Sequence, residues 1–269
     1  MQSVVWQEIE QLYQEFQKLG ISESVDYDKY YLYSLITHST AIEGSTLTEV
    51  ETQMLFDEGL TAKGKPLVYH LMNEDLKKAY ELAKDESKLK IPVTPVFLQK
   101  LNAALMRTTG STYNVMGGSF DSSKGDFRLC GVTVGFGGWS YMNYLKVPAK
   151  VEEFCNVLQQ RQNAVETLSD QYELSFNAHL NLVTIHPWVD GNGRTARLLM
   201  NYIQFCYNLF PTKIFKEDRE EYISALRLSQ EEEVNQPFLD FMAGQLKKSL
   251  SLEIERFNAS RKKGFSFMF

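Results

Sequence analysis

Twelve consecutive residues, His186 to Arg197, constrain this chain more than any other segment; they read HPWVDGNGRTAR. The sequence FNAHLNLVTI before them and RTARLLMNYIQF at their end both carry apolar residues at helical spacing. The segment therefore predicts two helices joined by a tight turn, with Gly191 and Gly193 at positions where a Cβ would be in the way. The second helix begins at this turn, and its unpaired backbone N–H groups favour an anion there.

The side chains of the same segment suit phosphate chemistry. Arg194 and Arg197 are three residues apart and share one helix face, where two guanidinium groups match the oxygens of a polyphosphate. Asp190 supplies a hard oxygen ligand for Mg²⁺ beside those phosphates. His186 can accept a proton near neutral pH. Together these side chains predict a polyphosphate site with a metal ligand and a general base.

The segment resembles the loop H-x-F-x-[D/E]-G-N-G-R-x-x-R of the Fic (filamentation induced by cAMP) family, with Trp188 where the family mostly has Phe. The resemblance implies a mainly α, Fic-type helical bundle with a small β-hairpin flap. It also implies a protein adenylyltransferase, which moves AMP from ATP, the co-substrate, to a Ser, Thr or Tyr hydroxyl of a target protein and releases pyrophosphate. In that reaction His186 deprotonates the hydroxyl and Asp190 holds Mg²⁺. The implied ATP contacts within the loop are Gly191, Asn192, Gly193, Arg194 and Arg197.

A second match lies upstream in the sequence STAIEG, at Ser39, Glu43 and Gly44. The segment of about 28–44 is predicted to form a helix that ends at Gly44. Glu43 then lies at the helix C-terminus, where the helix dipole disfavours a carboxylate unless a cation faces it. The match is to the family's inhibitory motif, [S/T]-x-x-x-E-[G/N], in the class with an N-terminal inhibitory helix. The resemblance implies that Glu43 pairs with Arg197 and leaves ATP misplaced.

The Gly-rich segment DFRLCGVTVGFGGW, about 126–139, is expected to form two short strands joined by a turn. By resemblance, matched at Arg128, Val134 and Gly135, it is the flap that covers the nucleotide, and a target protein would dock on its edge as an added strand. The implied flap contacts to ATP are Val134, Gly135, Phe136 and Gly137. The family's register further implies adenine contacts at Tyr222, Ile223 and Gln230.

Composition limits the class of protein and its partners. A net charge of −6 and a pI of about 5.4 lack the basic footprint of a nucleic-acid-binding protein. Three scattered cysteines predict no disulfide framework. The sequence shows neither a secretory leader nor an apolar run that could span a membrane, so we expect a cytoplasmic protein without a membrane partner.

The likeness covers roughly residues 30–245. We expect N-terminal helices over 1–60, a catalytic core over 61–245 with its loop at 186–197, and a helix end and tail over 246–269, all in one compact unit. The last residues, ASRKKGFSFMF, are expected to fray. The other expected helices lie near 3–19, from a Thr46–Glu49 capping box to Gly59, over 66–84, from Thr94 and Pro95 to before Gly110, from Pro148 onward, over 217–231, and from about 237 to 257.

Two other functions stay open. The first is the reverse reaction, in which Glu43 orients a water that removes AMP from a modified protein. The second is a non-catalytic, nucleotide-binding regulatory module. Self-modification and a homodimer also stay open, and the sequence does not identify the target protein.

Overall fold

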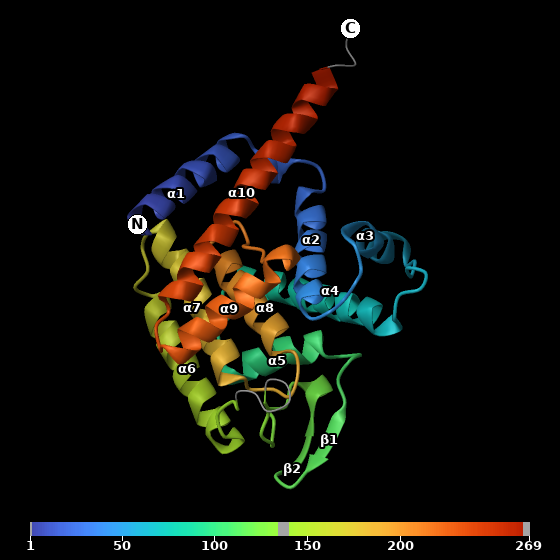
Figure 1. Cartoon of the computed structure of the whole chain (residues 1–269), viewed down its shortest axis with the longest axis vertical. Coiled ribbons are helices and arrows are strands. Elements are labelled where there is room, and N and C mark those ends of the chain that lie inside the picture. Colours follow the sequence, from blue (N-terminus) through green and yellow to red (C-terminus); the bar gives the residue numbers. More distant parts are fainter. Residues whose placement is uncertain (1, 134–139, 266–269) are drawn as a thin grey trace.

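The structure is a computed structural model that describes residues 2–133 and 140–265. Helices dominate it, and one antiparallel pair of short strands projects from the helical body (Figure 1). The long helices and the strands are α1 (Gln2–Lys18), α2 (Tyr27–Ile42), α3 (Glu49–Glu58), α4 (Leu67–Lys88), α5 (Pro95–Leu105), β1 (Thr112–Val115), β2 (Gly118–Asp121), α6 (Val147–Gln162), α7 (Leu168–Ile185), α8 (Asn192–Cys206), α9 (Arg219–Glu231) and α10 (Gln236–Phe265). The mainly α bundle that the sequence predicted is confirmed.

Two helices in the middle of the bundle, α7 and α8, pack against each other and carry the catalytic loop between them. Helix α4 covers α8 on one side, and α2 lies against both α4 and α8. Helix α1 runs along α10, which extends beyond the rest of the bundle (Figure 1). One cluster of buried apolar side chains reaches from Trp6 to Ile254, so the helices share a continuous core. Among the described residues, no helix is both long and apolar enough to cross a membrane.

Helix ends follow local sequence signals, with one shift of register. Thr94 caps α5 ahead of Pro95, as expected. The capping box of α3, however, joins Thr48 to Glu51 rather than Thr46 to Glu49. The sequence TLTEVE holds both patterns in overlap. In the structure Glu51 completes the box, while the Glu49 carboxylate accepts a hydrogen bond from Ser34 on α2, at 2.7 Å.

The strands lie upstream of the place where the sequence predicted them. They occupy 112–121, where the Tyr113 and Phe120 rings stack across the pair at 5.1 Å. Of the expected flap, 126–139, the structure describes residues 126–133, and these form no β-strand. Thr133 makes a single antiparallel bridge to Ser140, and the backbone N–H of Tyr141 donates to Val132 O at 3.1 Å. The implied ATP contacts Val134, Gly135, Phe136 and Gly137 lie outside the described residues.

The C-terminal helix is longer than expected. The sequence predicted its end near residue 257 and a frayed tail, but α10 continues to Phe265. The added residues, NASRKKGF, contain no proline, and Gly264 alone does not end the helix. The expected boundary at residue 245 therefore falls inside one unbroken helix.

Candidate active site

The catalytic loop leaves α7 with a sharp change of backbone direction at His186. Its φ of 53° and ψ of 61° place it in the left-handed region, and its N–H donates to Leu182 O at 3.1 Å. The loop enters α8 through Gly191, which has a φ of 80°. A Cβ on Gly191 would lie 2.9 Å from the Asn102 side chain and 3.0 Å from the Met106 sulfur. A glycine is therefore required here both by conformation and by close packing on α5.

Two side chains of the loop hold it in place from inside. Trp188 is fully buried, and its indole N–H donates to Gly125 O at 3.0 Å. The Asn192 amide donates to Trp188 O at 2.9 Å and accepts from Trp188 N at 3.0 Å. The Asn192 side chain therefore braces the loop, and its contact with a nucleotide stays a prediction. The backbone N–H groups at the start of α8 are available for the phosphate cradle expected at residues 191–193.

His186 is held as a neutral imidazole. Its ring stacks on Tyr141, with centroids 3.6 Å apart and an interplanar angle of 14°. Burial, with a further contribution from the nearby Arg128 charge, lowers the pKa of His186 to about 4. A neutral imidazole at physiological pH can accept a proton, as a general base must.

Arg128 links the catalytic loop to both sides of the expected flap. It is almost completely buried and donates to His186 O at 2.8 Å, Cys130 O at 2.8 Å and Met142 O at 2.7 Å. Its backbone N–H also donates to Pro187 O at 3.0 Å. The sequence indicated Arg128 only as a family match, and this role was not predicted. An arginine in an apolar, Gly-rich segment needs buried hydrogen-bond acceptors, and this requirement was the one sequence signal for the bonding role of Arg128.

Arg194 has donors without acceptors. Its side chain is 4% exposed, at the N-terminal end of α8. Nη2 lies 3.4 Å from Asp190 Oδ1 and 3.6 Å from the Met106 sulfur. Among the described residues, Nε and Nη1 have no hydrogen-bond partner. Because buried unpaired donors are costly, this group is well suited to an anion that completes its bonding.

Arg197, one turn further along α8, is fully occupied. Nε donates to Ser39 Oγ at 2.8 Å, and Nη2 donates to Ser39 O at 3.0 Å and to Glu43 Oε1 at 2.6 Å. Nη1 donates to the Tyr222 hydroxyl at 3.3 Å. Burial raises the pKa of Glu43, but the adjacent Arg197 charge outweighs it and the pKa is lowered overall. The ion pair that the sequence predicted between Glu43 and Arg197 is thus present, and its acid is ionised.

The end of α2 is fixed against the start of α8. Glu43 is the last cap residue of α2, and Gly44 follows with a φ of 100°. Arg219 Nε donates to Ile42 O at 2.8 Å and so satisfies a terminal carbonyl of the helix. A Cβ on Gly193 would lie 2.6 Å from Glu43 Oε1. The absence of a side chain at Gly193 therefore lets the Glu43 carboxylate approach Arg197.

The three residues implied for adenine contact do not form one surface. Tyr222 is 2% exposed, and its hydroxyl lies 3.0 Å from His179 Nε2 as well as near Arg197. Tyr222 therefore belongs to the arginine network, and its ring faces the core. Ile223 is 44% exposed, and Gln230 Nε2 donates to Thr184 Oγ1 at 3.0 Å. An adenine contact stays a prediction for all three residues.

Asp190 is the one motif carboxylate at the surface of the turn. Its side chain is 62% exposed, and Oδ1 accepts from Gly191 N at 2.6 Å. The described residues contain no group of three or more His, Cys, Asp or Glu side chains that could hold a metal. Mg²⁺ commonly binds through one or two carboxylates together with substrate phosphates and water. Asp190 beside the unpaired Arg194 donors fits that mode of binding.

Comparison with known proteins agrees with this geometry. Residues 92–204, which include the catalytic loop, match the family model Fic, described as Fic/DOC family. This chain contains a Fic/DOC family domain. It is 30% identical over 226 residues to a protein adenylyltransferase Fic of Drosophila willistoni, a match that covers 81% of this chain and 40% of that protein. The corresponding protein of Drosophila virilis is 30% identical over 223 residues, with 81% and 41% covered.

Solved structures share the fold. A Fic domain-containing signaling protein from Bacteroides thetaiotaomicron superposes with a TM-score of 0.80 at 24% identity, covering 94% of this chain and 98% of that one. Fic-1 from C. elegans gives a TM-score of 0.76 at 20% identity, covering 96% and 74%. The chain spans about 40% of the length of the curated relatives it matches.

Proposed function

We propose that this chain is a protein adenylyltransferase that moves AMP from ATP to a Ser, Thr or Tyr hydroxyl of a target protein and releases pyrophosphate. The observation that carries the proposal is the buried Arg194 guanidinium, whose unpaired nitrogens lie at the start of α8. Such a group binds phosphate oxygens strongly because both partners are charged and shielded from water. The names of the Drosophila relatives support the same activity.

The reaction follows from the residues around this anion site. The target hydroxyl attacks the α-phosphorus of ATP while neutral His186 takes its proton, so a new P–O bond forms. The bond to the β-phosphate oxygen breaks, and pyrophosphate leaves. Arg194 and the N–H groups at the start of α8 stabilise the charge that develops on the phosphates. Asp190 would hold Mg²⁺, which neutralises phosphate charge when bound.

The same geometry supports inhibition by α2. Arg197 lies on the face of α8 that carries Arg194, but its three guanidinium nitrogens are bonded to Ser39, Tyr222 and Glu43. A γ-phosphate therefore competes with the Glu43 carboxylate for this guanidinium. We expect ATP to bind with its γ-phosphate displaced until α2 moves away.

The test is transfer of label from radioactive ATP. Wild type, Glu43→Gly and Glu43→Gly/His186→Ala are incubated with Mg²⁺ and either α-³²P-ATP or γ-³²P-ATP, alone and with a cell lysate. We expect protein label from the α-phosphate only, at least tenfold stronger in Glu43→Gly than in wild type, and lost with His186→Ala. Label from the γ-phosphate, or label that survives His186→Ala, would contradict AMP transfer.

One observation also favours the reverse reaction as a second candidate. The Glu43 side chain is 35% exposed, so a water can reach the carboxylate while Oε1 stays bonded to Arg197. In that position Glu43 could orient the water toward AMP on a modified protein. Release of AMP from a labelled target by wild type, but not by Glu43→Gln, would support this role; release by both variants would exclude it.

A further inference from the structure

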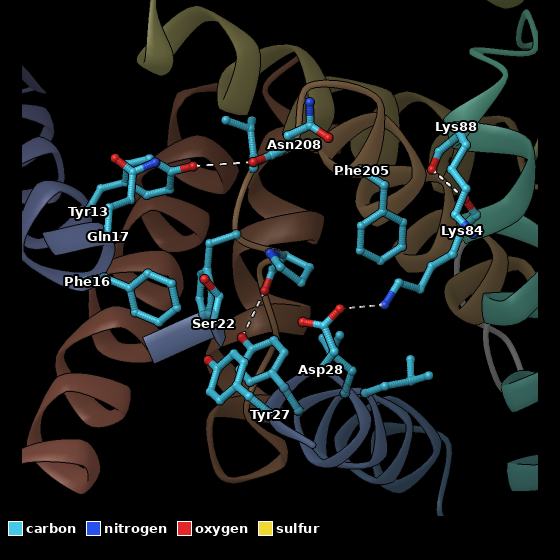
Figure 2. A pocket seen from close by; sticks show the side chains of 17 residues that line it. Tyr13, Phe16, Gln17, Ser22, Tyr27, Asp28, Lys84, Lys88, Phe205 and Asn208 are labelled. Atoms are coloured by element: carbon cyan, nitrogen blue, oxygen red, sulfur yellow. Dashed lines mark hydrogen bonds and ion pairs between the residues drawn. The ribbon is translucent and has the colours of Figure 1, made fainter. Parts of the chain in front are cut away.

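A cavity of about 370 Å³ lies at the end of α2 that is remote from the catalytic loop (Figure 2). Its walls come from α1, α2, α4 and the end of α8, and no residue of 186–197 lines it. A volume of this size is typical of small-molecule sites. The wall includes six aromatic side chains: Tyr13, Phe16, Tyr27, Tyr31, Phe205 and Phe210.

The lining of this cavity carries two lysines and one carboxylate, although the chain as a whole is acidic. The lysines, Lys84 and Lys88, come from the end of α4; Lys88 Nζ pairs with Asp85 Oδ1 at 2.8 Å, and the carboxylate in the lining is Asp28. Lys84 Nζ lies 3.2 Å from Asp28 Oδ2, and Figure 2 shows the two side chains reaching toward each other at the edge of the cavity. Lys84 Nζ also lies 5.8 Å from the centre of the Phe205 ring. An apolar body inside and an anionic group at Lys84 would match both features.

The cavity and the inhibitory ion pair lie at opposite ends of the same two helices. On α2, Leu35 lines the cavity and Glu43 follows eight residues later. On α8, Arg197 precedes the cavity residue Phe205, also by eight residues. Both separations correspond to about 12 Å along a helix. Whatever fixes α2 against α8 at the cavity therefore also acts on the distance between Glu43 and Arg197.

We propose that this cavity binds a small amphipathic anion, with an apolar body among the aromatic rings and a carboxylate or sulfonate at Lys84, and that its occupancy strengthens the Glu43–Arg197 ion pair. The cavity and the ion pair exist together in this arrangement of the helices. A ligand that fits the cavity stabilises that arrangement over one in which α2 has moved, by the difference in affinity. The regulatory part rests on the proposed inhibition by Glu43.

Binding is tested with the fluorescent probe 8-anilinonaphthalene-1-sulfonate and the full chain. Lys84→Met removes the rim charge but keeps the length of the side chain, so the dissociation constant should rise by about tenfold. Lys78→Met is the matched control, because Lys78 is an exposed lysine of the same helix that pairs with Glu81 and does not line the cavity. Equal affinity of Lys84→Met and wild type, or an equal loss in both variants, would overturn the site.

A second variant tests occupancy of the cavity itself. Ser22 is an exposed residue of the short turn Ile21–Glu23 and lines the cavity, so Ser22→Trp can fill the entrance without disturbing the core. We expect the probe to lose at least tenfold in affinity. Unchanged affinity in Ser22→Trp, at unchanged melting temperature, would place the probe elsewhere and overturn the proposal.

Coupling to the ion pair is tested by hydrogen exchange, which does not depend on activity. Probe at about three times its wild-type dissociation constant should slow exchange of backbone amides over residues 36–44 severalfold in wild type and change it little in Lys84→Met, which binds about tenfold more weakly. It should also reduce α-³²P labelling in wild type but not in Glu43→Gly. Probe binding without slower exchange would overturn the regulatory part. Slower exchange with no labelling in any variant would instead refute the adenylyltransferase activity and leave the site intact.

Discussion

Arg194 and Arg197 are one helical turn apart on α8, equally buried, and opposite in bonding. Arg197 donates to Ser39, Glu43 and Tyr222, whereas two nitrogens of Arg194 have no partner among the described residues. A buried guanidinium without acceptors is unfavourable for folding alone. The contrast indicates that Arg194 is available to bind a ligand. The hydrogen bonds of Arg197, in turn, are already made by side chains of the protein.

The difference also separates stability from function within one motif. The Arg197 side chain ties α8 to α2, so it contributes to the fold as long as Glu43 stays in place. The Arg194 side chain makes few bonds within the fold, and we propose that phosphate oxygens complete its bonding.

The largest expected effect is on the free energy of unfolding. Arg197→Met should lower it by about 3 kcal/mol, near the low end for a broken buried pair because a third of the Glu43 side chain is exposed. Arg194→Met should change it by less than about 1 kcal/mol, since the lost group makes few hydrogen bonds. Urea unfolding measures both. Equal losses would show that the two arginines play the same structural role.

A smaller effect is expected at Ser39, which accepts from Arg197 through its hydroxyl and its carbonyl oxygen. Ser39→Ala removes only the hydroxyl and should lower the free energy of unfolding by about 1 kcal/mol. The double variant Ser39→Ala/Arg197→Met should be no less stable than Arg197→Met alone, because the bond can be lost only once. Additive losses would place the Ser39 contribution outside this network.

A weaker perturbation uses the missing side chain at Gly193. Gly193→Ala introduces a Cβ that would lie 2.6 Å from Glu43 Oε1, so the flexible carboxylate must shift. We expect α-³²P labelling to rise roughly threefold over wild type, equivalent to less than about 1 kcal/mol of population shift. In the Glu43→Gly background the same substitution should give no rise. A rise in both backgrounds would assign the effect to the nucleotide site instead.

The smallest effect is expected from pH. The pKa of His186 is about 4, so the imidazole stays neutral between pH 7 and pH 5. Labelling by Glu43→Gly should therefore be nearly flat from pH 7 to pH 5.5, where a histidine with an ordinary pKa near 6.5 would lose about tenfold. A depressed pKa also means that the unfolded state binds the extra proton, so this contribution to stability falls as pH drops from about 6.5 to 4. An acid limb near pH 6.5 would contradict the buried environment of His186.

Much of this account could be predicted from the sequence. Apolar periodicity predicted α7 and α8, and the glycines predicted the turn at Gly191. The Glu43–Arg197 pair followed from a carboxylate at a helix C-terminus and the family resemblance. These features depend on local spacing, which the sequence records directly.

Other features depend on contacts between distant segments and were missed. The ring of Tyr141 stacks on His186, and Arg128 binds three carbonyl oxygens around the loop. Neither contact could be predicted from the spacing of residues along the sequence. Strands β1 and β2 are only four residues each. TYNV alternates in burial but GSFD does not, so the pair is too short and irregular to predict from its pattern. The register along α9 also could not show that Tyr222 faces Arg197.

The claim that Glu43 occupies the Arg197 guanidinium is tested most directly by nucleotide affinity. The measurement is the ratio of the dissociation constants for ADP and ATP, with Mg²⁺ present, in wild type and Glu43→Gly. With Glu43 on Arg197, the γ-phosphate gains no charge-assisted bond, and wild type should bind the two nucleotides about equally. In Glu43→Gly the free guanidinium should favour ATP by about tenfold, the value of one charged hydrogen bond. The same ratio in both proteins would contradict the claim that Glu43 occupies the site of the γ-phosphate.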